Sequence, residues 1–381
     1  LLDLLWPNAV ATGSPAGHRY GVINRGGRPR LIIPLDSRRA AAAAATRLSS
    51  DVGAKGRALR HAAGFGLRSG VAQPFLRRRW TSVAGSPPSL ETYLAAALGI
   101  DDICLAVTVG PPRPNRKPVI EILRPTGRTL AFAKVGWNGL TRHLVAREAA
   151  VLNGLDRALL SEIVAPRVLH HGTWNDLDVV VLSPLNTPPG TTVAREPSTG
   201  ELEQTAALHP RSDHPLGSSP YLPVVRDRVD RRDNDDAGLL NAALEKATAE
   251  LGSDPVAFAG WHGDWTPWNM MATRNELLVW DWERATGPVP LGLDAIHYHF
   301  QTAWLRERTP APDAFTAALS RSRGSVTGLG VRADQIQPLG VLYLVELFLR
   351  YAENADHGTE ELRRGRHETI ATTLRELVAD E

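Results

Sequence analysis

The sequence is poor in cysteine, methionine and aromatic residues, and it has no long hydrophobic run. Its 381 residues include one Cys (Cys104), two Met and 6% aromatic residues. A single Cys excludes a disulfide framework and any multi-cysteine zinc site, and it agrees with a reducing compartment. The longest nearly apolar stretch, Val341 to Leu349, contains Glu346 and is far shorter than the ~20 residues that span a bilayer. Since the amino terminus also lacks a basic leader, we expect a cytoplasmic protein that does not enter a membrane.

Charge is distributed unevenly along the chain. The net charge is +2, but residues 1–100 contain 14 Lys and Arg against 4 Asp and Glu, so this segment carries +10 and the remainder carries −8. The two parts should attract each other. The basic run Arg77 to Arg79 beside Trp80 has the chemistry of a phosphate or nucleic-acid contact. A solvated face or an internal contact with acidic residues explains the run better, and we do not expect a nucleic-acid partner.

The first hundred residues have a pattern of predicted elements that differs from the rest of the chain. Residues 20–24 and 30–35 flank Gly26-Gly27 and predict a β-hairpin, and Ser37 is placed to cap an Ala-rich helix over residues 38–48. A Gly/Ser/Pro stretch and a short helix ending at Gly99 follow. The sequence therefore predicts a basic cap segment over residues 1–100, with a boundary near residue 100.

Residues 101–186 predict a small lobe that contains both strands and a helix. Three apolar runs, ICLAVTV, PVIEIL and TLAFAKV, are separated by turn-rich segments and predict an antiparallel meander. Asn138 can cap a helix that continues to Gly154, and two further strands follow in RVLHHG and LDVVVLSPL. Beyond a Pro-rich connector, residues 187–381 predict a mainly helical lobe with helices over 238–251, 294–306, 313–322, 337–354 and 360–378.

The segment that carries chemistry lies within the helical part. It reads WHGDWTPWNMM over residues 261–271, and the strand LLVWDWE follows it. Phosphoryl transfer needs one carboxylate to orient and deprotonate a hydroxyl, plus an amide and a second carboxylate to hold magnesium. Asp264, Asn269 and Asp281 are side chains of those types in that order.

These two segments resemble the aminoglycoside phosphotransferase and choline kinase-like family. The family's catalytic loop reads H-G-D-x-x-x-x-N and is followed by a strand ending I-D-W/F, and this chain departs from that pattern by having Trp280 in place of the Ile. The resemblance implies that Asp264 is the catalytic base and that Asn269 and Asp281 are magnesium ligands. It also implies that His262 shapes the loop.

The resemblance further implies a nucleotide site in the mixed lobe. A lysine on the third strand and a glutamate on the next helix should form an ion pair that positions the phosphates of ATP. Lys134 and Glu148 lie in those elements, and Glu148 has only apolar neighbours one turn away on its own helix. Backbone groups around Ser183 to Leu185, after the last strand, are implied to bind adenine.

Several other residues have simpler interpretations. The segment Gly110 to Asn115, where a phosphate-covering loop is expected, has three prolines that offer no N–H group, and the glycines of Gly64 to Gly70 lie in a helical pattern. Asp294 is placed to cap a helix, and the resemblance implies that it braces the catalytic loop. His297 and His299 are two residues apart and should not share a metal. Glu283, beside the motif, and an acidic cluster at Asp230, Asp233, Asp235 and Asp236 could favour a cationic acceptor, although the cluster reads better as a solvated loop.

Together these features predict an α+β, two-lobed, protein-kinase-like fold with an additional N-terminal segment. The resemblance implies an enzyme that uses ATP and Mg²⁺ to phosphorylate a hydroxyl of a small molecule such as a sugar, an aminoglycoside or an amino alcohol, in a cleft between the lobes. The alternative is a catalytically weak, kinase-like nucleotide-binding or scaffold protein, suggested by the proline-rich loop and the basic segment.

Overall fold

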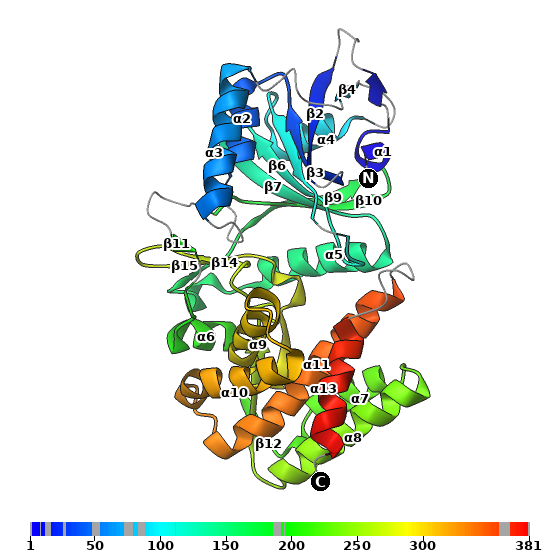
Figure 1. Cartoon of the computed structure of the whole chain (residues 1–381), viewed down its shortest axis with the longest axis vertical. Helices are drawn as coiled ribbons and strands as arrows, with labels where there is room; N and C mark the ends of the chain where they lie inside the picture. Colours follow the sequence, from blue (N-terminus) through cyan, green and yellow to red (C-terminus); the bar gives the residue numbers. More distant parts are fainter. Residues whose placement is uncertain are drawn as a thin grey trace. The chain divides into compact units, whose positions relative to one another are not determined.

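The structure is a computed structural model in which the chain forms two compact units. One unit comprises Leu1–Asn153 and Pro166–Asn186, and the other comprises Gly154–Ala165 and Thr187–Glu381 (Figure 1). The structure describes all residues except 1, 8, 12–16, 26–27, 48–53, 72–78, 83–87, 111, 186–191, 194, 358–365 and 380–381. Among the described residues, no helix is long and apolar enough to cross a membrane.

The first unit is built on one nine-stranded sheet. Its strand order is β1-β4-β2-β3-β5-β6-β7-β10-β9, and every pairing is antiparallel. The strands are β1 (Ala9–Ala11), β2 (His18–Arg25), β3 (Arg28–Pro34), β4 (Arg79–Ser82), β5 (Cys104–Thr108), β6 (Val119–Leu123), β7 (Thr129–Gly136), β9 (Val168–Trp174) and β10 (Leu177–Leu182). The predicted hairpin and the predicted meander are both present in this sheet.

The helices of this unit begin and end at the residues that the sequence marks. Ser37 caps α2 (Arg38–Thr46) by accepting from the backbone N–H of Ala40, and Gly99 ends α4 (Leu90–Leu98) with φ +65°. Asn138 precedes α5 (Gly139–Gly154), and its Oδ1 accepts from the N–H of Thr141 at 2.8 Å. The glycines at 64 and 66 lie inside α3 (Ala54–Ser69), as the helical pattern predicted.

The sheet buries apolar side chains on both of its faces. Alternate residues of β5 point in opposite directions: Leu105 and Val107 pack with Leu90 and Leu94 of α4, whereas Cys104 and Ala106 pack against the alanines of α2. Figure 1 shows α2 and α3 side by side along one face of the sheet. Five alanines of α2 are buried there, so packing adds to their high helix propensity.

The boundary that the sequence suggested near residue 100 does not separate two compact units. β3 pairs with β5 in the register Leu31↔Thr108 and Ile32↔Val107, so the first hundred residues continue the sheet of the meander. A buried carboxylate also joins three segments of the first hundred residues, because Glu91 of α4 accepts from Trp6 Nε1 at 2.8 Å and from the Tyr20 hydroxyl of β2 at 2.5 Å. The apolar run of a strand cannot reveal whether its partner lies in the same domain.

The second unit is mainly helical. Its helices are α6 (Thr199–Ala206), α7 (Tyr221–Val229), α8 (Asn234–Leu251), α9 (Leu293–Gln301), α10 (Ala311–Gly328), α11 (Ile336–Asp356) and α13 (Arg366–Ala379). Its two small sheets have the orders β11-β14-β15-β8 and β12-β13-β16. Their strands are β8 (Ile163–Val164), β11 (Thr192–Val193), β12 (Ser212–His214), β13 (Val256–Trp261), β14 (Met270–Ala272), β15 (Leu277–Val279) and β16 (Thr286–Pro290). The five helices that the sequence predicted all occur, although residues 360–365 of the last one lie outside the described residues.

Helix α11 forms the centre of the second unit. Residues 338–350, Pro338 through Arg350, are all buried, and α11 contacts α7, α8, α9, α10 and α13. The apolar stretch Val341 to Leu349 is therefore the core of a helical unit. Residues 154–165 belong to this unit because β8 pairs with β15, in the register Leu277↔Ile163.

Candidate active site

A buried strand and a glycine set the course of the candidate catalytic loop. All six residues of β13 are buried, and the chain turns sharply after Trp261 because Gly263 has φ +77°. A Cβ atom at this position would lie 2.8 Å from the backbone oxygen of Arg284, so the turn requires glycine for conformation and for space. The side chain of Asp264 follows directly after this turn.

Asp294 holds the backbone of the loop, as the resemblance implied. Its Oδ2 accepts from the N–H of His262 at 2.7 Å, and its Oδ1 accepts from the N–H of Gly263 at 2.9 Å. The side chain is buried in the first turn of α9, and burial raises its pKa to about 6 despite the two hydrogen bonds. One carboxylate therefore fixes two consecutive backbone groups immediately before Asp264.

The carboxylate of Asp264 is held at both oxygens. Asn269 Nδ2 donates to Oδ2 at 2.7 Å and to the backbone oxygen of Asp264 at 3.1 Å, and His297 Nε2 lies 3.3 Å from Oδ1. Partial burial favours the neutral acid, but the hydrogen bond from His297 and the positive charge of Arg350 hold the pKa of Asp264 well below its usual range. With 34% of its side chain exposed, Asp264 is an ionised and accessible acceptor at neutral pH.

A short hairpin brings Asn269 and Asp281 together. Asn269 precedes β14 and Asp281 follows β15; these strands pair in the register Met270↔Val279, and the N–H of Trp280 donates to the backbone oxygen of Asn269 at 3.1 Å. Asp281 has left-handed backbone angles, φ +67° and ψ +50°, which are uncommon outside glycine. Two residues that are twelve apart in the sequence thus lie at one end of the hairpin.

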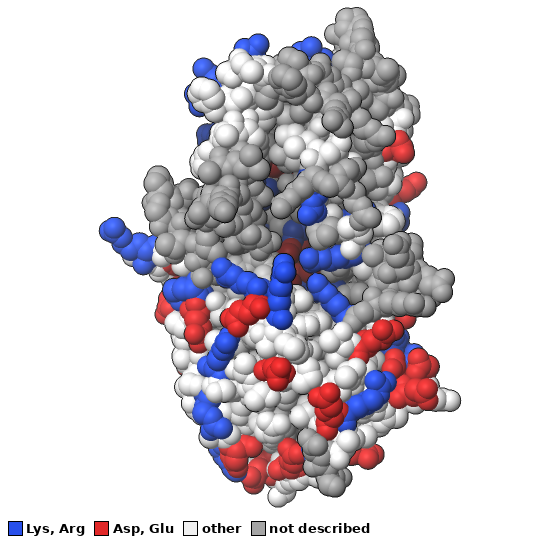
Figure 2. All heavy atoms as spheres, viewed as in Figure 1, with Lys and Arg blue, Asp and Glu red and all other residues white. Residues whose placement is uncertain are grey.

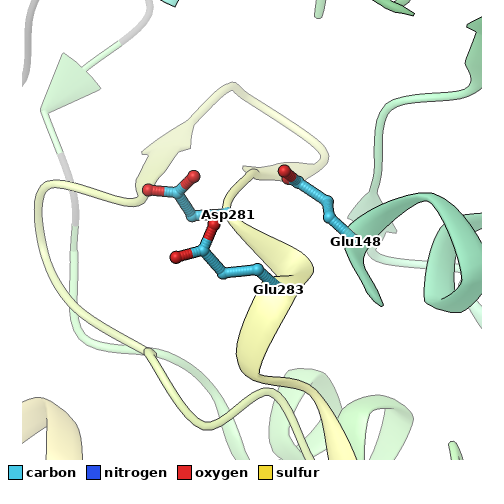
Figure 3. Close-up of side chains that lie close together, drawn as sticks. All are labelled: Glu148, Asp281 and Glu283. Carbon is cyan, nitrogen blue, oxygen red and sulfur yellow. The ribbon is translucent and has the colours of Figure 1, made fainter. Parts of the chain in front are cut away.

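Oxygen atoms suited to a divalent cation gather at this end. Figure 3 shows the carboxylates of Asp281 and Glu283 close together, and one oxygen of each lies within 4.8 Å of the other (Figure 3). Since Asn269 Nδ2 donates to Asp264, its Oδ1 is the amide atom left to act as a ligand. Carboxylate and amide oxygens are hard ligands of the kind that Mg²⁺ prefers, so these residues fit a magnesium site.

His262 is a packing residue of the loop. Its ring is fully buried and meets Trp282 edge-on at 4.7 Å between centroids, and its Nδ1 accepts from the N–H of Asp264 at 3.2 Å. Burial lowers its pKa to about 4, so the imidazole is neutral at physiological pH. These contacts agree with the predicted role of shaping the loop.

The first unit contains the predicted pair of Lys134 and Glu148. Lys134 lies in β7 between Val119 of β6 and Val180 of β10, and its Nζ is 2.7 Å from Glu148 Oε1 of α5. Both side chains are more than nine-tenths buried, so each charge stabilises the other in a place that little water reaches. Figure 3 also labels Glu148 on α5. The geometry of the pair is as predicted, and its role toward a nucleotide stays a prediction.

The segment after β10 offers few backbone donors. The N–H of Ser183 already donates to the backbone oxygen of Arg167 at 2.8 Å, and Pro184 has no N–H. Of Ser183 to Leu185, Leu185 therefore carries the N–H that could be offered to a base. The predicted contact of Ser183 and Leu185 with adenine stays a prediction.

The sequence did not predict the roles of His297 and Tyr343 in the site. His297 was considered only as a metal ligand, whereas its Nε2 faces Asp264 and its Nδ1 lies 3.1 Å from the Tyr343 hydroxyl. The spacing of three residues between Asp294 and His297 was the available signal, because it places both on one side of α9. His299 points elsewhere, 3.0 Å from Glu196 Oε1.

The residues of the acidic cluster lie at the ends of two helices on the surface of the second unit. Asp233 caps α8 by accepting from the N–H of Asp236 at 2.9 Å, and Asp230 follows the last residue of α7. Figure 2 shows acidic side chains gathered over α7 and α8, where the sequence predicted a solvated loop (Figure 2). Arg77, Arg78 and Pro111 lie outside the described residues.

Comparison with known proteins identifies the fold. No protein-family model matches the sequence, and no curated protein matches it. Aminoglycoside phosphotransferase APH(4)-Ia, in a ternary complex with ADP and hygromycin B, is 11% identical over 77% of this chain and 99% of its own, with a TM-score of 0.50. A putative fructosamine-3-kinase from Haemophilus somnus 129PT is 13% identical over 76% and 96%, with a TM-score of 0.44.

A spectinomycin phosphotransferase, APH(9)-Ia, bound to ADP and spectinomycin, is 12% identical over 75% of this chain and 93% of its own, with a TM-score of 0.44. The likeness to APH(4)-Ia shows that the chain has the α+β, kinase-like fold of an aminoglycoside phosphotransferase. The resemblance inferred from the two motifs is thereby confirmed at the level of the fold.

Proposed function

We propose that the protein is an ATP-dependent kinase that transfers the γ-phosphoryl group to a hydroxyl of a small molecule. The observation that carries this proposal is Asp264: an ionised carboxylate, one third exposed, fixed at both oxygens and adjacent in sequence to a glycine turn. A carboxylate so placed can orient a hydroxyl and accept its proton. The kinase-like fold supports the same reaction.

In this reaction Asp264 binds the acceptor hydroxyl and takes its proton as the oxygen attacks the γ-phosphorus. The O–H bond breaks, the new O–P bond forms, and the bond to the β-phosphate oxygen breaks so that ADP leaves. Lys134, held by Glu148, places a positive charge for the phosphates. Asn269 and Asp281, with Glu283, would hold magnesium, which neutralises charge on the triphosphate when it is bound.

The acceptor is a sugar, an aminoglycoside or an amino alcohol. Glu283 lies next to the proposed magnesium ligand Asp281 and is 6% exposed. A carboxylate at this position favours metal binding over recognition of a cationic acceptor. A panel of neutral sugars, aminated sugars and amino alcohols, each tested with ATP, will identify the class.

The proposal is tested with two substitutions that should behave differently. Asp264→Asn removes the base but leaves the metal ligands, so nucleotide binding should persist while turnover falls by about 10² or more, the scale of general-base catalysis. Asp281→Asn removes a ligand and should weaken magnesium-dependent nucleotide binding as well. Calorimetric titration with a non-hydrolysable ATP analogue, with and without magnesium, and a coupled kinase assay measure both effects.

Asp227→Asn is the matched control, because Asp227 is an exposed carboxylate that pairs with Arg231 on the surface of α7. It should leave binding and turnover unchanged. Near-normal turnover of Asp264→Asn would contradict the assignment of the base. Absence of turnover by the unaltered protein on the whole panel, with nucleotide still bound, would favour a nucleotide-binding protein without kinase activity.

A further inference from the structure

A buried histidine on α9 lies directly against the proposed catalytic base. His297 is three residues after Asp294, so both face the same side of the helix. Asp294 holds the loop backbone at His262 and Gly263, and His297 holds the side chain of the next residue, Asp264. One helix turn therefore contacts three consecutive residues of the catalytic loop.

The directions of the hydrogen bonds around His297 follow from the chemistry of its neighbours. The ionised carboxylate of Asp264 can only accept, so His297 Nε2 must donate to Oδ1 across 3.3 Å. In a neutral imidazole the other nitrogen is an acceptor, and the Tyr343 hydroxyl can donate to Nδ1 across 3.1 Å. The two contacts are compatible with one tautomer, protonated at Nε2.

The surroundings keep His297 neutral. Its ring is 1% exposed, and burial lowers its pKa, opposed by the hydrogen bond to Asp264 and assisted by the positive charge of Arg350. The titratable or charged groups near it are Asp264 and His262 of the loop, and Tyr343 and Arg350 of α11. Because Tyr343 is fully buried and burial raises its pKa well above the usual range, its hydroxyl remains a donor.

Packing alone does not account for these side chains. Ile296 and Phe300 on the same helix are fully buried, and Leu342 and Leu344 flank Tyr343 on α11. A Leu at 297 and a Phe at 343 would fill such an interface without placing polar groups in it. Burying an imidazole and a phenol costs free energy unless each finds a partner. The partner at the end of this chain of hydrogen bonds is Asp264.

We propose that Tyr343 and His297 form a positioning relay that fixes Oδ1 of Asp264, while Asn269 fixes Oδ2. The relay prevents the carboxylate from rotating about its Cβ–Cγ bond, so that one lone pair stays directed at the acceptor hydroxyl. This inference rests on the proposed function, since it assigns Asp264 as the base. The relay does not touch nucleotide or acceptor, so its loss should lower kcat and leave KM for ATP unchanged.

Three variants test the relay. His297→Leu removes both hydrogen bonds and should lower kcat at least tenfold, whereas His297→Gln can donate to Asp264 and should restore most of that loss. Tyr343→Phe removes only the outer hydrogen bond and should lower kcat severalfold. His299→Gln is the matched control on the same helix, because His299 pairs with Glu196, and its kcat should stay that of the unaltered protein.

A spectroscopic measurement tests the relay without any activity. Two-dimensional ¹H–¹⁵N spectra of the full protein labelled at its 12 His report the tautomer of each ring, and the spectrum of His297→Gln assigns the signal of His297. At pH 7 we expect a neutral ring protonated at Nε2, and a mixture of tautomers in Tyr343→Phe. A ring protonated at Nδ1, or a charged ring, would overturn the relay even if the protein is an active kinase.

The kinetic and spectroscopic results separate the two proposals. If no acceptor is phosphorylated but His297 is protonated at Nε2, the proposed function fails and the relay geometry stands. A kcat for His297→Leu within threefold of the unaltered protein would overturn the relay in an active enzyme. His297→Gln and Tyr343→Phe change little volume, so these two variants decide the question if His297→Leu does not fold.

Discussion

At the scale of single residues, folding shifts the pKa values of His262 and Asp294 in opposite directions. His262 has a pKa of about 4 in the folded protein, below its ordinary 6.5, and Asp294 has a pKa of about 6, above its ordinary 3.8. Between pH 6.5 and 4 the unfolded chain gains a proton on His262 that the folded protein does not bind. Between pH 6 and 3.8 the folded protein gains a proton on Asp294 that the unfolded chain does not.

The two residues should therefore change the pH dependence of stability in opposite directions. As pH falls from 6.5 to 4, the shifted pKa of His262 lowers the free energy of unfolding by on the order of 3 kcal/mol. As pH falls from 6 to 3.8, the shifted pKa of Asp294 raises the free energy of unfolding by a similar amount. His262→Asn should flatten the loss of stability between pH 6.5 and 4.5, and Asp294→Asn should steepen it. Urea unfolding at four pH values measures both slopes, and parallel curves for the unaltered protein and the two variants would contradict both pKa shifts.

The candidate catalytic loop also shows what single residues reveal before a structure is known. The order and spacing of Asp264, Asn269 and Asp281 predict that they meet, because a loop and a short hairpin separate them. Asp294 was predicted to brace the loop, and its two hydrogen bonds bear this out. The spacing of Asp294 and His297 places both on one side of α9, but the contact of His297 with Tyr343 depends on how α9 packs on α11, and no local pattern encodes that packing.

At the scale of elements, β7 and α5 place a lysine and a glutamate in contact. Lys134 and Glu148 are separated by the end of the strand and the first turns of the helix, and they form a buried ion pair at 2.7 Å. Removing one partner takes away the close opposite charge of a buried group, which is destabilising. The two residues should thus act as a unit.

A double-mutant cycle tests this coupling. Lys134→Met and Glu148→Gln should each weaken binding of a non-hydrolysable ATP analogue, and the double variant should be scarcely worse than either single one. The coupling energy in thermal unfolding should also be non-zero. Arg142→Met is a suitable control on α5, because Arg142 contacts the backbone of Asp176 away from the pair. Additive losses of binding would show that Glu148 does not act through Lys134.

Most elements could be predicted because their signals are local. Ser37, Asn138 and Gly99 mark helix ends, and alternating or apolar runs mark the strands of the meander. The segment 187–236 lies outside the five predicted helices, yet it contains α6 and α7. The π-helical turn Thr302–Arg306 at the end of α9 was predicted as plain helix, because the apolar spacing there does not distinguish the two.

At the scale of the whole molecule, the first hundred residues are part of the first unit's core. Ile33 and five alanines of α2 pack with Cys104, Ala106 and Leu123, so the two parts share one apolar cluster. A protein that begins at Asp101 would expose this cluster and the edge of β5 to water. We expect it to aggregate or to lose its cooperative unfolding transition.

Size-exclusion chromatography, circular dichroism and thermal unfolding of the truncated protein check this expectation. Substitution of Asp3 and Arg19 by Ala in the full chain changes exposed charges of the same segment and should leave the fold intact. A monomeric truncated protein with a sharp unfolding transition would show that residues 1–100 are a dispensable addition.

The pairing of β3 with β5 also has a consequence for the order in which the chain folds. During synthesis β3 is completed before α2, α3, β4 and α4, and its partner β5 is made only after all of them. Until then β2 and β3 can form a hairpin, but the free edge of β3 has no neighbour to pair with. The nascent chain therefore carries an open sheet edge until β5 has been made, and we expect the net charge of +10 on residues 1–100 to oppose self-association of that intermediate.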